Sequence, residues 1–295
     1  MSESQHTLAG RISFEGVGLH TGRTVHVTLS PAAADSGIGF VRTDVTDKNN
    51  RVRAAAEAVC QTRLGTVIGN AEGVTVSTVE HLMAAFCALG VDNAVVELDG
   101  PEAPIMDGSA QPFVELLDRA GRQAQGAPRR WIEILAPVEV VEGDKRAALT
   151  PAPRFEMAFE ILFDAPAIGR QTIDLPMDEA TFRAELAEAR TFGFMHEFEQ
   201  LKAAGLARGA SMENVTAIED GRVLNPDGVR RVDDFVRHKA IDAIGDLYLL
   251  GAPILGRFEA RYSGHALNNA LVRALLDRPQ AWRFVSRTSP ATTAA

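Results

Sequence analysis

The chain has 295 residues, of which 46% are hydrophobic and 23% are charged. These are the proportions of a globular protein with one large domain or two of ordinary size. Lys and Arg number 30 against 39 Asp and Glu, so the formal net charge is -9. Sequence-independent binding of nucleic acid needs a basic surface, and this acidic balance therefore argues against a nucleic-acid partner.

Two features predict a cytoplasmic protein without stable membrane insertion. The N-terminus lacks a basic stretch followed by an apolar one, and no apolar run approaches the roughly 18 residues of a membrane span. Cys60 and Cys87 have no CxxC spacing, and we expect them to be buried free thiols. Free thiols are typical of a reducing compartment.

The first half of the chain is predicted to place strands before helices. Gly and Asp turns separate strand-like segments at 11–20, 23–32 and 37–45. Residues 73–100 predict a strand, a helix and a second strand. Ser77 or Thr78 is expected to cap this helix, and Gly90 is expected to end it. A turn and an amphipathic helix follow at 104–121.

The second half begins again with strands after a polar stretch at 122–130, which carries Gly and Pro and reads as a linker. Strands are predicted within 131–153, 155–164 and 168–176. Helices are predicted over 177–194, 196–209 and 235–251. A strand, a Gly-containing turn and a helix complete the pattern at 254–279.

Strands followed by helices in each half predict an α+β fold of two similar layered domains, with strands packed on helices. We expect an N-terminal domain over 1–125 and a C-terminal domain over 131–286, joined by the linker at 122–130. The small, polar residues 287–295 are expected to form a flexible tail.

The helix over 235–251 carries an apolar face and, opposite to it, a stripe of four polar residues: His238, Lys239, Asp242 and Asp246. His238 and Asp242 are four residues apart, so their side chains project together from neighbouring turns. This pair either holds a metal ion or belongs to a solvated helix surface. Catalytic zinc takes three protein ligands and a water, so a third ligand must come from elsewhere.

His81 is the leading candidate for that ligand, and Glu80 directly precedes it. A His beside a Glu can supply a ligand and a base. However, Ser77 and Glu80 also have the S-x-x-E spacing of a capping box. Taken alone, this spacing favours the capping role of Glu80 over a catalytic one. His265 lies in a Gly-containing turn between a strand and a helix, where a catalytic, capping or surface role is open.

Six blocks, taken together in chain order, are more specific than any single pair. They are TVEHLMAAF, MDGSA, ARTFGF, RVLNPDG, FVRHKAIDAIGDL and SGHALNNALV. Together they resemble the LpxC family of UDP-3-O-acyl-N-acetylglucosamine deacetylases, zinc amidases that commit bacteria to lipid A synthesis. The resemblance extends from GVGLHTG near the start of the chain to SGHALNN near its end.

This resemblance implies two similar α+β domains with the metal site between them. It makes His81, His238 and Asp242 the ligands of one Zn²⁺ per chain. Fe²⁺ accepts the same imidazole and carboxylate ligands, so the sequence leaves the metal in cells open.

The resemblance also implies the catalytic groups. Glu80 becomes the general base, and His265 becomes the electrostatic partner and general acid. Thr191 would stabilise the oxyanion. Asp246 would keep His265 protonated and oriented, because a nearby carboxylate raises the pKa of an imidazole. Lys239 matches a charged position that contacts the substrate.

An insert in the second half of family members forms an apolar passage for the acyl chain. The matching residues here are Phe192, Phe194, Met195, Phe198, Leu201 and Leu206. Taken alone, the same residues predict an ordinary amphipathic helix packed on its domain. Phe163 falls near a position that stacks on the nucleobase, and Arg261 and Tyr262 fall near one that meets the diphosphate.

The implied reaction is zinc-dependent hydrolysis of the N-acetyl group of UDP-3-O-[(3R)-3-hydroxyacyl]-N-acetylglucosamine. Its products are UDP-3-O-acyl-glucosamine and acetate, and the site requires no oligomer. The alternative is a metal-dependent amidohydrolase that acts on another acylated amine.

Overall fold

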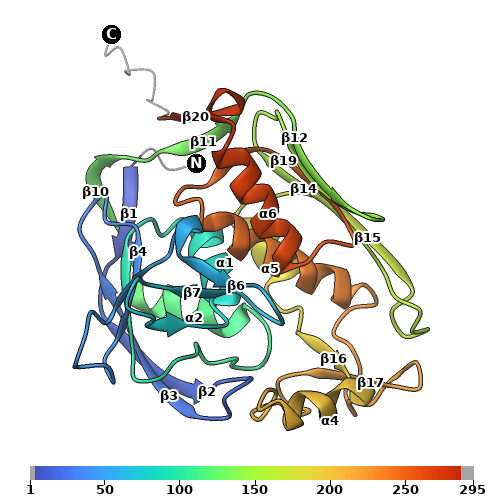
Figure 1. The fold of residues 1–295 in the computed structure, drawn as a ribbon. Coiled ribbons are helices and arrows are strands. Elements are labelled where there is room, and N and C mark those ends of the chain that lie inside the picture. The colour runs from blue at the N-terminus through green and yellow to red at the C-terminus, as the bar shows by residue number, and fades with distance from the viewer. Residues whose placement is uncertain (1–3, 287–295) are drawn as a thin grey trace.

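The computed structural model describes residues 4–286, which form two α+β halves that lie against each other (Figure 1). Each half combines a sheet with helices, so the predicted layered α+β class is confirmed. The predicted tail at 287–295 lies outside the described residues. No helix of the described part of the chain has both the length and the apolar character needed to cross a membrane.

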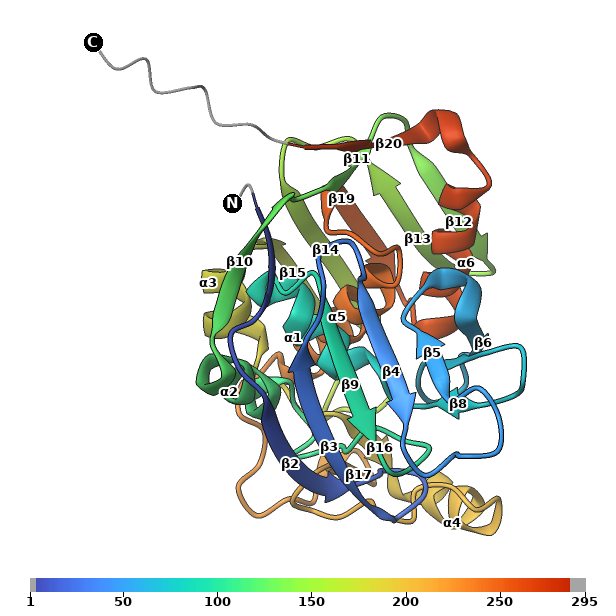
Figure 2. The same ribbon diagram turned by 90° about the vertical axis from the view of Figure 1, so that its left-hand side faces the viewer.

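The first half has a five-stranded sheet with helices behind it (Figure 2). In order across the sheet, its strands are β2 (Ile12–Val17), β3 (Thr24–Pro31), β9 (Ala94–Leu98), β4 (Ile38–Arg42) and β5 (Arg51–Arg53). Its helices are α1 (Glu80–Leu89) and α2 (Gln111–Ala120). A short 3-10 helix and a small sheet precede α1: Ala56–Ala58, β6 (Val59–Gln61), β7 (Val67–Gly69) and β8 (Thr75–Val76).

The second half has a seven-stranded sheet and its own pair of long helices. The strands are β11 (Trp131–Ile134), β12 (Val138–Glu142), β13 (Lys145–Thr150), β14 (Phe155–Leu162), β15 (Arg170–Pro176), β19 (Ile254–Arg261) and β20 (Trp282–Val285). The helices are α5 (Asp234–Tyr248) and α6 (His265–Leu276), with a 3-10 turn at Pro279–Ala281. Between β15 and α5 lies a segment that we call the insert, residues 192–223: β16 (Phe192–Phe194), α4 (Met195–Ala203), β17 (Thr216–Glu219) and β18 (Arg222–Val223).

The five-stranded sheet has the same topology as five strands of the seven-stranded sheet. In the first half, β9 pairs antiparallel with β3 and parallel with β4, while β2 and β5 add antiparallel outer strands. In the second half, β19 pairs antiparallel with β13 and parallel with β14, while β12 and β15 take the outer positions. The order along the chain matches as well, which makes α1 equivalent to α5 and α2 equivalent to α6. The halves are therefore similar in design, although their sequences show no clear repeat.

The equivalent helices α1 and α5 pack directly on each other at the centre of the molecule. A Cβ atom on Gly245 would lie 2.0 Å from the Glu80 carbonyl oxygen, so only glycine permits this approach. Every residue of α5 except Arg237 and Lys239 is buried. The polar side of α5 therefore faces α1 and the site, and the alternative of a solvated helix surface is wrong.

The predicted linker is a paired strand. Residues 122–128 form β10 (Arg122–Pro128), which pairs antiparallel with β1 (Ser4–Leu8). The segment still runs from one half to the other (Figure 2). Its polar composition did not reveal the strand, because it pairs with a partner more than a hundred residues away in the sequence.

The predicted cap of α1 is wrong. The helix begins at Glu80 without a side-chain cap. The Ser77 hydroxyl donates to a backbone carbonyl of another segment, and the Thr78 hydroxyl donates to Glu102 Oε1 at 3.1 Å. Gly90 ends the helix as predicted, with a left-handed φ of 69°.

Two further expectations need correction. The helix predicted over 177–194 is limited to α3 (Glu179–Thr181) and a π-type turn (Phe182–Leu186), and the end of the segment is the strand β16, which pairs with β17. Both cysteines are free, as expected, but Cys60 is exposed on β6 and Cys87 is half-buried.

Candidate metal centre

Three predicted metal ligands meet where α1 packs on α5. His81 Nε2 and His238 Nε2 each lie 3.4 Å from Asp242 Oδ1. All three residues are buried, and one ligand atom from each lies within 4.8 Å of the others. Zinc binds nitrogen and oxygen ligands at about 2.0–2.2 Å, so atoms at this spacing can share one ion.

His238 is held in the form that a metal requires. Its Nδ1 lies 3.1 Å from the Ala189 carbonyl oxygen, which can only accept, so Nδ1 donates and the Nε2 lone pair faces Asp242. Burial lowers the pKa of His238 to about 3, which keeps the imidazole neutral. A backbone carbonyl on the remote nitrogen is a common way to orient a ligating histidine.

Asp242 is ionised despite its burial. Burial opposes the charge, but the Lys239 ammonium holds the pKa of Asp242 well below its ordinary value. Lys239 Nζ donates to Asp242 Oδ2 at 2.9 Å, which leaves Oδ1 directed at the two histidines. The donor set therefore consists of two imidazoles and one carboxylate, as expected for a divalent cation.

Glu80 lies beside this set and is free of the capping role. Its Oε2 accepts a hydrogen bond from the Thr66 backbone N–H at 3.0 Å, and its Oε1 lies 3.8 Å from His265 Nε2. Burial raises the pKa of Glu80, against the opposing charge of His265. A carboxyl with a raised pKa is better matched to proton transfer near neutral pH.

His265 faces the same space from the first turn of α6. Its Nδ1 lies 2.9 Å from Asp246 Oδ2, and its Nε2 lies 3.8 Å from Asp242 Oδ2. Burial disfavours the charged imidazole, but Asp246, Glu80 and Asp242 together raise the pKa of His265 to about 9. The side chain is therefore a cation at neutral pH, directed towards the predicted metal ligands.

Thr66 links these groups and was missed by the sequence analysis. Its hydroxyl donates to Asp246 Oδ1 at 2.5 Å and lies 3.3 Å from His265 Nδ1, while its N–H binds Glu80. The only local signal is Gly65, whose φ of 157° brings the backbone against the Glu80 carboxylate. Thr66 and Asp246 are separated by 180 residues, so no spacing rule could pair them.

Thr191 is fixed through its backbone. Its N–H donates to the Gly108 carbonyl and its carbonyl accepts from Thr216, both at 2.8 Å. Within the described residues, the Thr191 hydroxyl has no hydrogen bond to the metal ligands or to Glu80. The structure thus anchors the residue between the MDGSA block and β17, and its role stays a prediction.

Three phenylalanines named in the sequence analysis lie in contact beside the predicted metal ligands: Phe163, Phe192 and Phe194. The Phe192 ring lies 6.4 Å from the His238 ring, and Lys239 Nζ lies 5.7 Å from the Phe192 centroid. Phe163 contacts both Phe192 and Phe194, with centroid distances of 5.6 and 5.9 Å. The structure therefore brings together residues that were separate candidates in the sequence.

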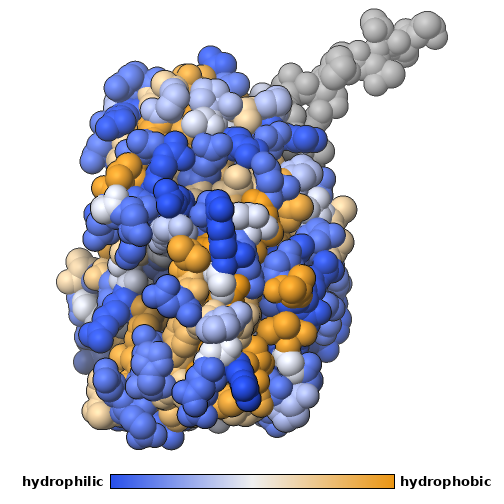
Figure 3. All heavy atoms as spheres, turned by 90° about the vertical axis from the view of Figure 1, so that its right-hand side faces the viewer, coloured by the Kyte–Doolittle hydropathy of each residue, from blue (hydrophilic) through white to orange (hydrophobic). Residues whose placement is uncertain are grey.

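The insert differs from an ordinary packed helix. α4 has no buried residue, and Met195, Phe198 and Leu201 are all half-buried. Figure 3 shows hydrophobic side chains gathered in the lower middle of the face that carries β15 and the insert. Apolar side chains left partly open in this way suit a ligand-binding surface better than a structural one.

Arg261 and Tyr262 lie at the far end of β19. The Arg261 guanidinium stacks on the Tyr262 ring at 4.7 Å, and the Tyr262 hydroxyl lies 3.3 Å from Glu160 Oε1. None of their described contacts joins them to the predicted metal ligands, so a diphosphate contact stays a prediction.

Known proteins match almost the whole chain. Residues 5–277 match the LpxC family, described as UDP-3-O-acyl N-acetylglycosamine deacetylase. A UDP-3-O-acyl-N-acetylglucosamine deacetylase from Phenylobacterium zucineum is 68% identical over 95% of both chains. Proteins of the same name from Shewanella sp. (strain W3-18-1) and Myxococcus xanthus are each 49% identical over 96% of this chain, and over 92% and 90% of their own lengths. With its two similar halves and its buried ligand set, the chain belongs to the UDP-3-O-acyl N-acetylglycosamine deacetylase family.

Proposed function

We propose that this protein hydrolyses the N-acetyl group of UDP-3-O-acyl-N-acetylglucosamine in the cytoplasm, the committed step of lipid A synthesis. The observation that carries the proposal is the geometry at the α1–α5 contact. Three convergent ligands, a buried carboxylate and a cationic imidazole lie within a few ångströms of one another. The names of the relatives supply the substrate.

We assign His81, His238 and Asp242 as ligands of one zinc ion per chain, a donor set that iron(II) also accepts. When bound, such an ion polarises a carbonyl and lowers the pKa of a water to about 7. All these residues come from one chain, so the proposed site is complete in a monomer.

Glu80 and His265 divide the proton transfers between them. The Glu80 carboxylate takes a proton from the attacking water, whose oxygen bonds to the acetamide carbon. His265, held protonated by Asp246, stabilises the negative charge that develops on the carbonyl oxygen. As the C–N bond breaks, His265 passes a proton to the sugar amine. We assign the Thr191 hydroxyl as a further donor to the developing oxyanion.

The acyl chain would lie along the insert. Phe192, Phe194 and Met195 offer apolar surface that begins at the metal ligands and continues onto α4. Lys239 lies at the border of this surface, between Asp242 and the Phe192 face, where its ammonium can contact the polar part of the substrate.

We propose domain boundaries of 1–125 and 131–286, with which the site lies between the two domains.

Acetate release from UDP-3-O-acyl-N-acetylglucosamine tests the proposal. We expect activity in the purified protein, loss after chelation and recovery with zinc. A panel of acylated amines without the nucleotide, assayed in parallel, separates the alternative amidohydrolase. Turnover of those amines with none of the nucleotide sugar would overturn the substrate, and full activity after complete removal of metal would overturn the chemistry.

A further inference from the structure

The GVGLHTG block, residues 16–22, ends in a tight turn at residues 18–22, which we call the glycine turn. The Gly22 N–H closes it by donating to the Gly18 carbonyl at 2.9 Å. A Cβ atom on Gly18 would lie 2.4 Å from Glu102 Oε2, so glycine at this position makes room for a carboxylate inside the turn. The turn is therefore built around Glu102, a residue that has no part in the proposed metal centre.

Glu102 is fully buried and engaged on both of its carboxylate oxygens. Oε2 accepts from the backbone N–H and from the hydroxyl of Thr21, at 2.8 and 2.7 Å. Oε1 accepts from the His20 backbone N–H at 2.8 Å and from the Thr78 hydroxyl at 3.1 Å. A buried acceptor that loses its donor is costly, so these bonds fix the glycine turn and Thr78 relative to each other.

Thr78 carries this constraint to the proposed base. It lies two residues before Glu80, at the entry of α1, with a left-handed φ of 57° that is uncommon for a residue branched at Cβ. The next residue, Val79, donates its N–H to the Thr66 carbonyl at 3.4 Å, and the Thr66 N–H binds Glu80 Oε2. The Thr78 hydroxyl thus helps to hold the backbone from which Glu80 projects.

The other side of the glycine turn supports the end of the insert. The Arg208 N–H donates to the His20 carbonyl at 3.2 Å, and the Gly209 N–H donates to the Leu19 carbonyl at 3.0 Å. A Cβ atom on Gly209 would lie 2.2 Å from the Gly18 carbonyl oxygen, so backbone packs directly on backbone here. The turn belongs to the first half and the insert to the second, so these bonds join the two halves just beyond α4.

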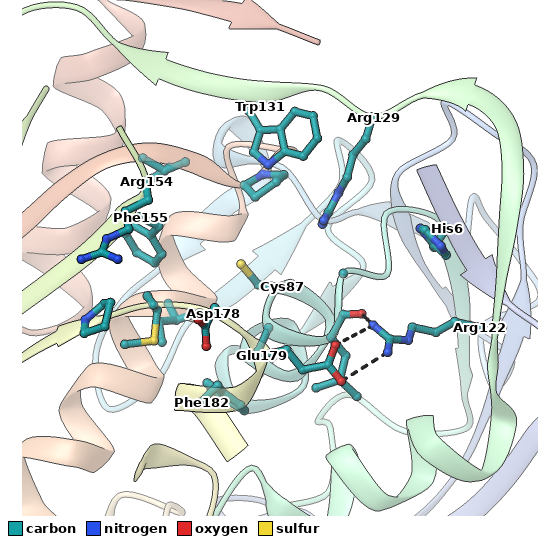
Figure 4. A pocket seen from close by; sticks show the side chains of 18 residues that line it. His6, Cys87, Arg122, Arg129, Trp131, Arg154, Phe155, Asp178, Glu179 and Phe182 are labelled. Atoms are coloured by element: carbon teal, nitrogen blue, oxygen red, sulfur yellow. Dashed lines mark hydrogen bonds and ion pairs between the residues drawn. The ribbon is translucent and has the colours of Figure 1, made fainter. Parts of the chain in front are cut away.

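Another junction between the halves is of a different kind. Figure 4 shows Arg122 of β10 and Glu179 of α3 at the wall of a cavity of about 750 Å³. Arg122 Nη1 donates to Glu179 Oε2 at 2.9 Å, and the Glu179 side chain is 36% exposed. An ion pair that water reaches holds two segments loosely, whereas the buried bonds of Glu102 hold them at defined positions. Glu179 is therefore a suitable control for Glu102.

We propose that Glu102 is a positioning residue with two arms, an inference that rests on the function proposed above. The arm to Thr78 holds the start of α1 and thereby the position of Glu80. The arm to His20 and Thr21 holds the glycine turn and thereby the insert, whose apolar surface is the proposed site of the acyl chain. The first arm governs the chemical step, and the second governs substrate binding.

Steady-state kinetics with a long-chain substrate separate the two arms. Thr78→Val removes one hydroxyl at nearly constant shape and should lower kcat roughly tenfold with KM unchanged, because Glu80 is misplaced. Thr21→Val loosens the glycine turn and should raise KM roughly fivefold with little change in kcat. Glu102→Gln places an amide donor where an oxygen accepted, so it should show both changes. Thr78→Ser and Thr21→Ser keep the hydroxyls and should restore wild-type values.

Glu179→Gln makes the same substitution at the other junction and should leave kcat and KM at their wild-type values. A purely structural role for Glu102 would lower the active fraction, so kcat would fall in all three variants with KM unchanged. That result, or serine variants that behave like the valine variants, would overturn the proposal. If Glu102→Gln does not fold, the contrast between Thr78→Val and Thr21→Val decides alone.

Amide hydrogen exchange tests the arm to the insert without turnover. We expect exchange at Arg208 and Gly209 to rise roughly tenfold in Thr21→Val and Glu102→Gln, because their acceptors lie on the loosened turn. Thr78→Val and Glu179→Gln should exchange as the wild type does. Unchanged exchange in Glu102→Gln would overturn this arm. A wild-type protein without deacetylase activity would instead overturn the proposed function, while the exchange result would still decide whether Glu102 holds the insert.

Discussion

The two halves of the molecule share a topology but use their equivalent helices differently. α1 begins with a buried carboxylate, Glu80, and supplies one proposed ligand directly after it. α5 also begins with a buried carboxylate, Asp234, but supplies its proposed ligands one and two turns later. Close packing at Gly245 brings the first turn of α1 against the middle of α5, so the two sets converge.

The halves also differ in what precedes each of these helices. Between β5 and α1 the chain forms the small sheet. Thr66 lies directly before its strand β7, is 2% exposed and is bonded to the catalytic candidates. Between β15 and α5 it forms the insert, whose α4 has no buried residue. The shared scaffold thus places the chemistry, while the second insertion offers open surface for a substrate. Substitutions at the α1–α5 contact should therefore have larger effects than substitutions in the insert.

The largest effect is expected for the proposed acid and base. Glu80→Ala and His265→Ala should each lower kcat by roughly 10²–10⁴-fold, the usual contribution of a positioned proton-transfer group. Metal content should stay at the wild-type level, because neither residue belongs to the proposed ligand set. Acetate release and elemental analysis on the same samples measure both. Glu57→Ala, at an exposed position, is the matched control, and wild-type turnover in either active-site variant would refute these roles.

Thr66 should come next. Thr66→Val removes the hydroxyl that binds Asp246 and leaves a buried carboxylate oxygen without its donor. We expect a loss of about 1–3 kcal/mol in the free energy of unfolding. kcat should also fall, by roughly tenfold, through misplacement of His265. Thr66→Ser keeps the hydroxyl and should retain most of both quantities. Equal behaviour of the two variants in denaturant unfolding and turnover would show that the hydroxyl has no such role.

Asp234 gives a pH test of the difference between the helix starts. Burial raises the pKa of Asp234 from 3.8 to about 6, against the nearby Arg190 and Arg230 groups that lower it. Between pH 3.8 and about 6, Asp234 is therefore protonated more often in the folded state than in the unfolded state. The free energy of unfolding consequently falls as the pH rises through this range. Above pH 6, Asp234→Asn should be more stable than wild type by up to roughly 3 kcal/mol, with the gap closing towards pH 4.

Asp233 is the control for that experiment. The Arg237 guanidinium lowers the pKa of Asp233, so its charged form stabilises the fold and Asp233→Asn should be destabilising at neutral pH. Urea unfolding of both variants across the pH range compares the two signs. A pH-independent gap for Asp234→Asn would contradict the assigned burial cost.

The smallest effect is expected in the insert. Phe194→Ala removes half-buried apolar surface that would contact the acyl chain. The loss should weaken binding by about 1 kcal/mol and raise KM for a long-chain substrate roughly fivefold. kcat should change little, and a short-chain substrate should be nearly unaffected. Glu199→Ala, exposed on α4, serves as the control. A fall in kcat as large as that of Glu80→Ala would remove the contrast between scaffold and insert.

The features predicted correctly are those that neighbouring residues in the sequence determine. Local patterns predicted most of the strands, the end of α1 at Gly90, and the shared face of His238 and Asp242 on α5. The pairing of β10 with β1 was not, because a polar strand is specified by its distant partner. The cap at Ser77 failed for a related reason, since Glu80 is directed into the site instead of back to its own helix. The order of strands and helices predicted two domains of similar design, but without a clear sequence repeat the shared pairing of their strands could not be predicted.

The most direct test of the proposed centre is a zinc titration of the metal-free protein that follows bound metal and acetate release together. We predict that both rise in parallel and level off at about one equivalent per chain. His238→Ala should bind no tight equivalent and recover no activity at the same zinc concentration. Full turnover before any zinc is added, or an unchanged one-equivalent break in His238→Ala, would contradict the assignment of His81, His238 and Asp242 as the metal ligands.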